Sequence, residues 1–415
     1  MAKKKRSYDV IVWGATGFTG RLVAEHLFET YGVDQSLKWA IAGRNDEKLH
    51  AVRDSLGDGA EQIPILVGDG SNAEDMQRIT AQTRAIATTV GPYVLYGGDL
   101  VAACARNGTH YCDLSGEVPW MRRMIDAHQR TAQQSGARIV HCCGFDSIPS
   151  DLGVWLMQQA AHERFNQSLQ RIHFYLGSSS GRLSGGTAAS MMEILSDAQR
   201  DLRTAKLLIN PYALNPKGEM SGDDHSEQFL PRRDEMTGKW VAPFVMASVN
   251  TRVVRRTNAL LDYPYGRDFR YQEWTLCGDG AAGMAKAAAL TAATGAFVAT
   301  AAIPPSRYMM QKLLLPKPGA GPDESQRKNG YFNIRFAGMT RDGDLLTATL
   351  HGERDPGYGC TSRMLGEAAV CLSAMPAKRN HGGFATPMSA LHAQLPQRLM
   401  ERAGLSFTVD AQTAD

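Results

Sequence analysis

The sequence predicts an α/β protein, in which a Rossmann-like, doubly wound parallel sheet carries an inserted α+β domain. Short apolar runs alternate with helical stripes over residues 1–150, and a glycine-rich turn follows the first run. From residue 169 onward, strand signals follow one another without regular helices. We expect a Rossmann domain over 1–150, an α+β domain over 151–352, and a C-terminal helical segment over 353–415 that packs back on the Rossmann domain.

Six strands are expected in the first domain, because each apolar run is too short for a buried helix. Helical stripes separate them, with Asn45 as the cap of the second helix and Ser71 or Asn72 as the cap of the third. Such alternation is typical of a parallel sheet. The expected strands are residues 8–13, 37–42, 62–67, 85–90, 110–113 and 138–142, and the expected helices are 20–31, 45–56, 72–80, 98–107 and 119–135.

The second domain is expected to hold an antiparallel or mixed sheet, and we interpret it as the substrate domain. Residues 210–239 are rich in Pro, Gly, Asp and Glu and predict a long loop or lid. Residues 316–330 predict a linker, and helices are expected at 361–375 and 387–403. The expected strands are residues 169–177, 245–257, 268–277, 331–338 and 344–351.

The composition is that of an ordinary soluble enzyme and excludes a disordered chain, a coiled coil or a fibrous repeat. Hydrophobic residues make up 43% of the 415 residues and charged residues 21%, and 45 basic against 42 acidic residues give a net charge of +3. This balance offers no basic stripe for nucleic acid. The seven cysteines form no C-x-x-C pair, so we expect no disulfide framework, no metal site and a reduced, cytoplasmic location.

The strongest local motif is Gly14-Ala15-Thr16-Gly17-Phe18-Thr19-Gly20. It follows the first strand and opens the first helix, the context that a dinucleotide-binding turn requires. Gly14 permits the tight turn, Gly17 lets the backbone approach a pyrophosphate, and Gly20 lets the helix pack on the sheet. A purely structural turn is the alternative. The position favours binding, so we predict that all seven residues hold the cofactor.

The end of the second strand indicates which dinucleotide is bound. An NAD site usually carries an acidic residue there, whereas this strand ends in Ala42-Gly43-Arg44. Arg44 can pair with a 2′-phosphate, which predicts NADP(H); the alternative is an arginine on a solvated helix start. Asp69, after the third strand, either accepts from the adenine amino group or begins a turn. Gly91 and Pro92, after the fourth, either line the nicotinamide or form a turn.

Several segments together resemble the saccharopine-dehydrogenase-like oxidoreductases, and within them the bacterial trans-acting enoyl reductases. The similarity extends nearly from end to end. It implies an NADPH-dependent enzyme that reduces a double bond left by a polyketide synthase during lipid synthesis. The expected partner is an acyl or polyketide intermediate, carrier-bound or free. The segments are residues 14–20, 42–44, 90–93, 111–117, 143–151, 184–187, 255–261 and 355–358.

Enoyl reduction needs a donor that stabilises the enolate and an acid that protonates the α-carbon. Tyr93, just after the fourth strand, is a candidate donor, and Asp146 and Ser147, after the sixth strand, are candidate acids. Asp113 and Glu117 share the same edge, where the carboxyl ends of parallel strands meet and ligands bind. For Asp146 and Ser147 the alternative is a helix cap.

The segment Ala281–Leu315 is apolar, but it is too rich in alanine for a membrane-crossing helix. We expect it to lie at a membrane interface or to line an apolar substrate mouth, with a buried helix or the surface of a homo-oligomer as alternatives. A group of arginines is expected on strands, facing either solvent or an acidic carrier. They are Arg252, Arg255, Arg256, Arg267 and Arg270.

Two other functions stay open at this point. One is a saccharopine-type amino-acid or imine dehydrogenase, which would need several Arg or Lys side chains aimed at substrate carboxylates. The other is a non-catalytic NADP-binding protein of a lipid surface.

Overall fold

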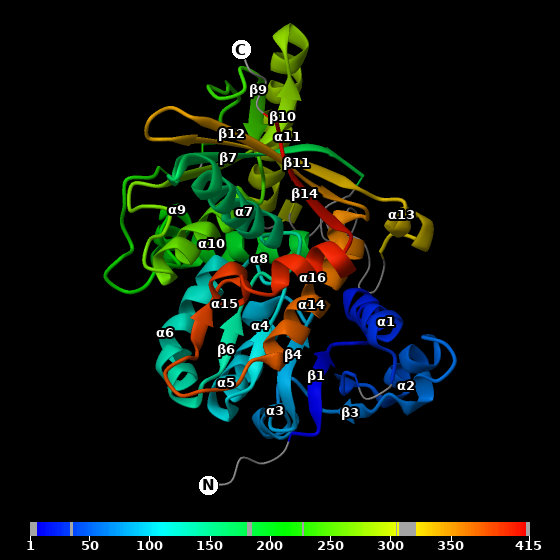
Figure 1. The fold of residues 1–415 in the computed structure, drawn as a ribbon. Helices are drawn as coiled ribbons and strands as arrows, with labels where there is room; N and C mark the ends of the chain where they lie inside the picture. The colour runs from blue at the N-terminus through cyan, green and yellow to red at the C-terminus, as the bar shows by residue number, and fades with distance from the viewer. Residues whose placement is uncertain are drawn as a thin grey trace.

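The computed structural model describes residues 6–33, 36–180, 185–225, 228–303, 305–306 and 321–411, with the backbone alone for 185–188 and 195. Two seven-stranded sheets form separate layers. Figure 1 shows the blue and cyan N-terminal strands below, the second sheet above, and the orange and red helices near the C-terminus between them.

The first sheet is parallel throughout, with the order β13-β6-β5-β4-β1-β2-β3. The chain runs outward from β1 to β3 and then crosses back to β4, so the strand order reverses between β1 and β4. Ligands bind outside the carboxyl ends of strands at such a reversal. The predicted parallel sheet is thus confirmed. Its strands are β1 (Tyr8–Trp13), β2 (Trp39–Gly43), β3 (Ile65–Val67), β4 (Thr83–Thr88), β5 (His110–Cys112), β6 (Arg138–Val140) and β13 (Gly383–Ala385).

Helices cover both faces of this sheet. One face carries α3 (Ala73–Thr80), α5 (Gly98–Asn107) and α6 (Val118–Ser135), and the other carries α1 (Phe18–Tyr31) and α14 (Thr361–Ala374). The short helix α2 (Asp46–Asp54) follows β2, and α4 (Tyr93–Tyr96) follows β4. The side chain of Asn45 caps α2 and that of Asn72 caps α3, as the sequence predicts.

The second sheet is mixed, with the order β14-β12-β11-β7-β10-β9-β8 and a parallel pairing of β7 with β10. The helix α7 (Ile148–Phe165) packs against its inner face so closely that a Cβ on Gly153 would lie 2.1 Å from the Phe336 ring. One apolar cluster extends from the first sheet through α7 to this face. The strands are β7 (Leu169–Ser179), β8 (Arg232–Arg233), β9 (Trp240–Pro243), β10 (Arg270–Gly278), β11 (Phe332–Thr340), β12 (Leu345–Gly352) and β14 (Leu405–Val409).

The prediction of a strand over 245–257 is wrong, because these residues belong to the helix α10 (Ala247–Leu260). The sequence of α10 is rich in the β-branched residues Val and Thr, which favour strands, but most of the helix is buried and tertiary packing overrides that preference. Arg252, Arg255 and Arg256 are buried on it, at 1%, 4% and 4% exposure, and the prediction that they face solvent or a carrier is wrong too.

These arginines bind the segment that the sequence predicts as a lid. Arg255 donates two hydrogen bonds to Asp224, at 3.0 and 2.6 Å, and Arg252 donates to the carbonyl groups of Leu208 and Asn210. Arg256 donates to the Leu214 carbonyl, and burial lowers its pKa to about 9. The first half of the 210–239 segment is therefore anchored to α10 rather than free to open.

The C-terminal segment holds two short strands that the sequence does not predict. The three-residue β13 joins the first sheet and β14 joins the second, so the segment connects both layers. The predicted helix over 387–403 is divided into α15 (Pro387–Leu391) and α16 (Leu395–Arg402). A strand as short as β13 carries no periodicity to detect.

Candidate functional site

The turn after β1 has the geometry of a dinucleotide cradle. Gly14 has a φ of +85°, and a Cβ there would lie 2.4 Å from Val90. A Cβ on Gly20 would lie 2.2 Å from the Gly14 carbonyl oxygen, so only glycine lets α1 come this near to the turn. Gly17 is exposed and precedes α1 without a side-chain cap, which leaves the first N–H groups of the helix to a ligand. These residues fit a pyrophosphate.

Arg44 lies exposed just beyond β2, on the same edge of the sheet. Asp69 follows β3 on that edge, and its Oδ1 accepts from the Ser71 N–H at 3.0 Å and from the Ser71 hydroxyl at 2.9 Å. These two hydrogen bonds, with a smaller effect of the nearby Arg44, lower the pKa of Asp69. Of the two roles predicted for Asp69, the structure therefore supports the one in which it begins a turn. Arg44 lies near Asp69.

Gly91 and Pro92 lead from β4 into α4, and a carboxylate from the next loop binds the first two N–H groups of α4. Glu117 is 1% exposed and accepts from the N–H groups of Tyr93 and Val94, at 2.8 and 2.7 Å. It also accepts from the hydroxyl of Ser190 at 2.8 Å, on α8 (Gly185–Arg200). Burial raises the pKa of Glu117. One carboxylate thus ties the backbone after β4 to a helix of the second domain.

The position of Tyr93 argues against its predicted role as the enolate donor. Its ring is 5% exposed, and its hydroxyl donates to the Thr88 carbonyl at 3.2 Å and accepts from the Leu114 N–H at 3.1 Å. Burial raises the pKa of the phenol well above its usual value. Because its proton is already committed to a carbonyl group, we assign Tyr93 to holding the β4 and β5 loops together.

The loops after β5 and β6 are joined through Asp113. Its carboxylate accepts from the Tyr111 hydroxyl at 2.8 Å and from the Ser115 N–H at 3.0 Å, and it lies 2.7 Å from Nδ1 of His141. It also accepts from the N–H of Cys142, which has a φ of +63°. Non-glycine residues hold such a conformation only when their surroundings enforce it, so this loop is rigid.

Asp146 and Ser147 follow that rigid loop but have different surroundings. Asp146 is half-buried, no hydrogen bond from the described part of the chain occupies its carboxyl group, and burial raises its pKa to about 6. Ser147 is fully buried, and its hydroxyl donates to Oδ1 of Asn250 at 2.9 Å. The structure therefore leaves Asp146 as a candidate acid and argues against Ser147, whose proton is held by Asn250.

The sequence does not reveal two residues that hold this site together. His141 and Asn250 bind Asp113 and Ser147, but a lone His after a strand or an Asn within an apparent strand gives no signal of a buried partner. Among the described residues, no group of three or more His, Cys, Asp or Glu side chains could hold a metal ion. Ser184, the first residue of the 184–187 motif, lies outside the described residues.

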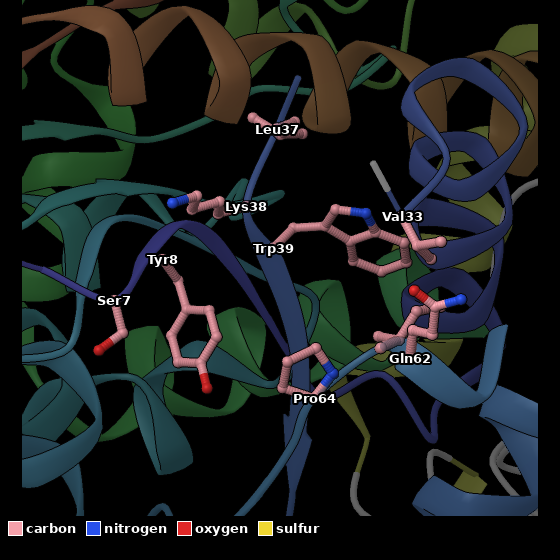
Figure 2. A pocket seen from close by; sticks show the side chains of 9 residues that line it. Ser7, Tyr8, Val33, Leu37, Lys38, Trp39, Gln62 and Pro64 are labelled. Carbon is pink, nitrogen blue, oxygen red and sulfur yellow. The ribbon is translucent and has the colours of Figure 1, made fainter. Parts of the chain in front are cut away.

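A separate depression of about 240 Å³ lies at the opposite, amino-terminal edge of the first sheet (Figure 2). Because dinucleotides bind at the carboxyl ends of strands, this depression is not the cofactor site. Its lining residues are Ser7, Tyr8, Val33, Leu37, Lys38, Trp39, Gln62, Ile63 and Pro64.

Comparisons with known proteins identify the family of this chain. Residues 10–140 match the family described as the saccharopine dehydrogenase NADP binding domain. A Mycobacterium tuberculosis protein named as a trans-acting enoyl reductase is 40% identical over 421 residues, which cover 98% of each chain. The trans-acting enoyl reductase of Mycobacterium ulcerans is 36% identical, over 96% of this chain and 97% of its own.

The fold also matches a solved structure. Saccharopine dehydrogenase (L-Glu forming) from Saccharomyces cerevisiae aligns with a TM-score of 0.54 and 12% sequence identity, over 97% of this chain and 99% of that one. The glycine cradle, the matched NADP-binding domain and the full-length relatives make this chain an NADP-dependent oxidoreductase. It belongs to the saccharopine-dehydrogenase-like oxidoreductases, in the group that includes the trans-acting enoyl reductases.

Proposed function

We propose that this protein reduces an α,β-unsaturated acyl or polyketide thioester with NADPH. The observation that carries the proposal is the similarity, over nearly the full length of both chains, to proteins named trans-acting enoyl reductases. Asp146, a half-buried carboxyl group that follows β6, supports it with a group able to give up a proton.

NADPH, when bound at the glycine-rich turn, would supply the hydride that the β-carbon gains. The residues of this chain do the rest. Asp146 protonates the α-carbon, which completes the reduction of the double bond. Glu117 holds the backbone after β4, where the nicotinamide would lie, and Asp113 holds the loop that carries Asp146. A fixed backbone at these points keeps the reacting carbons aligned.

We infer that NADPH is preferred over NADH because of Arg44. Its guanidinium is exposed at the end of β2, and a positive charge there matches the 2′-phosphate of NADPH. NADH lacks that phosphate, so the charge of Arg44 would not increase its affinity.

We propose three partners for this protein: a carrier-bound thioester, a membrane surface and a second copy of the chain. The helix α11 (Gly280–Ala302) supports the membrane contact, as it is long and apolar enough to cross a bilayer by length and composition, and its most apolar window has 11% of its residues buried. Gly283, Ala287 and Ala301 are its buried residues, whereas Met284, Leu290 and Val298, spaced along the helix, are 38–48% exposed. We propose that these exposed apolar residues contact lipid from the cytoplasmic side.

The amino-acid dehydrogenase is the weaker alternative. Recognition of an amino-acid substrate needs cations aimed at its carboxylates, but Arg252, Arg255 and Arg256 are buried and bound to groups of the protein itself.

The decisive test follows NADPH absorbance with a crotonyl thioester on an acyl carrier protein and on a small thiol. Saccharopine and a simple imino acid serve as the alternative substrates. We expect oxidation of NADPH with the thioesters, and faster turnover on the carrier. Turnover with the amino-acid substrates alone would overturn the proposal, and tight NADPH binding without any turnover would favour the non-catalytic function.

A further inference from the structure

The amino end of α1 differs in charge from those of its neighbours. The helices α2 and α3 each begin with an asparagine cap and two acidic residues in the first turn, which suit the positive end of a helix dipole. The helix α1 has neither a side-chain cap nor an acid in its first turn. Nothing in its own first turn compensates the dipole.

Two guanidinium groups lie near this end of α1 instead. The Cζ atoms of Arg21 and Arg327 lie 5.7 and 5.5 Å from the ring centre of Phe18, the first residue of the helix. Nε of Arg21 is buried without a hydrogen bond to the described residues, and its ion pair with Glu25 spans 3.5 Å. Cations near the amino end of a helix oppose its dipole. Both cations act on the Glu25 carboxylate, which lies further along α1, and an anion at the amino end itself would be stabilised by the two cations and by the helix dipole together.

Arg327 comes from the second domain, on α13 (Glu324–Lys328), and a rigid turn fixes its position. The Asp355 carboxylate accepts from the N–H groups of Gly357, Tyr358 and Gly359, at 2.8–3.3 Å. The Asp355 N–H in turn donates to the carbonyl of Arg327 at 3.2 Å. The turn and α13 thus form one unit.

This unit rests directly on the glycine-rich turn of the first domain. The Tyr358 ring meets the Phe18 ring edge-on, with 4.8 Å between the ring centres. A Cβ on Gly321 would lie 2.3 Å from the Phe18 ring, so the backbone there touches the ring. Nη1 of Arg327 donates to the Pro322 carbonyl at 2.8 Å, and this is the one hydrogen bond that the described residues make with its guanidinium. Further N–H groups remain for a ligand.

We propose that Arg327 is a cofactor-binding residue that faces the dinucleotide pyrophosphate, and that the Phe18–Tyr358 contact positions it. The dinucleotide then joins the two domains, because its pyrophosphate lies between α1 and a cation of the second domain. The inference rests on the cofactor site of the proposed function and does not depend on the enoyl substrate. It is also distinct from the role of Arg44, since pyrophosphate is common to NADPH, NADH and ADP-ribose.

The test is direct titration of purified protein with NADPH, NADH and ADP-ribose over a series of salt concentrations. We expect Arg327→Gln to weaken all three by about tenfold, as for loss of a charge-assisted hydrogen bond, and to reduce the salt dependence of Kd. Arg327→Lys should restore part of the affinity. Arg44→Ala should weaken NADPH alone. Lys328→Gln is the matched control, because this exposed neighbour pairs with Glu324 at 2.6 Å and should bind as the wild type does.

Substitutions at Tyr358 give a second, independent test of the proposal. Tyr358→Phe keeps the ring on Phe18 and should bind normally, whereas Tyr358→Ala should weaken all three ligands. The melting temperature of the ligand-free Arg327→Gln protein should not fall, while its rise on adding NADH should shrink. Unchanged Kd values for Arg327→Gln, a loss for NADPH alone, or an equal loss for Lys328→Gln would each overturn the inference. An absence of enoyl turnover would count against the proposed function only, because these are binding measurements.

Discussion

Arg44 carries the preference between the two nicotinamide cofactors in our proposal. Arg44→Ala should weaken NADPH binding by about 1–3 kcal/mol, because a charge-assisted pair with the 2′-phosphate is lost, and should leave NADH binding unchanged. Titration of both nucleotides measures this. The matched control is Arg84→Ala, which removes an exposed arginine of β4 that pairs with Asp9 at 3.7 Å. Equal losses for both nucleotides would remove Arg44 from this role.

Asp146 should determine how the reaction depends on pH. Burial raises its pKa from 3.8 to about 6, and a general acid must be protonated to act. We therefore expect kcat to fall as the pH rises above about 6, and Asp146→Asn to lower kcat by about 10²–10⁴ with NADPH affinity retained. Asp58→Asn, at an exposed position, is the control. A full rate in Asp146→Asn would show that another group gives the proton.

The same pKa links Asp146 to stability. A carboxyl group whose pKa is raised on folding favours the folded state while protonated, and this contribution is lost as the pH rises through about 6. Asp146→Asn cannot ionise, so its free energy of unfolding should fall less than that of the wild type between acidic and neutral pH. Urea unfolding at both pH values measures the difference.

At the level of elements, α10 holds the 210–225 segment through its buried arginines. Arg255 and Asp224 form an ion pair at 2.6 Å with side chains 3% and 1% exposed. Arg255→Met should lower the free energy of unfolding by about 3–5 kcal/mol, because Asp224 would stay buried without its cation. Urea unfolding followed by circular dichroism measures it.

Arg270 offers the matched comparison, since it lies exposed at the start of β10. Arg270→Met should change the free energy of unfolding by less than about 0.5 kcal/mol. If both variants lost the same small amount, α10 would not be the anchor of this segment.

At the level of the whole molecule, α11 leaves a long apolar side uncovered by the described residues. If that side contacts lipid, Leu290→Glu with Val298→Glu should lower partition to anionic vesicles, and wild-type binding should weaken as salt is added. Both residues are about 40% exposed, so the changes should leave the fold intact. Leu345→Glu, equally exposed on β12, is the control. If the intact protein does not bind the vesicles, the lipid contact is wrong and α11 is instead a surface for a second copy of the chain. Light scattering would then detect a dimer.

The sequence by itself determined the parallel sheet, the glycine cradle and the family. These are local properties: an apolar run, a cap such as Asn45 or Asn72, and a turn that tolerates only glycine can all be recognised within about ten residues. Arg44 and Asp146 could be placed at the carboxyl edge for the same reason, because in a parallel sheet the residue that ends a strand always reaches that edge.

The tertiary structure decided what each of those side chains is free to do. Tyr93 and Ser147 stand at the predicted edge, but the Tyr93 hydroxyl donates to the Thr88 carbonyl and the Ser147 hydroxyl donates to Asn250, which lies 103 residues further along the chain. No pattern in the sequence reveals either partner. The buried α10 looked like a strand because its Val and Thr residues favour strands, whereas the packing of the whole helix in the interior decides its conformation. Likewise Arg327 lies at the glycine-rich turn because residues distant in the sequence, Gly321 and Tyr358, pack on Phe18. Sequence places groups along an edge by local rules, whereas long-range contacts decide which of them remain available for chemistry.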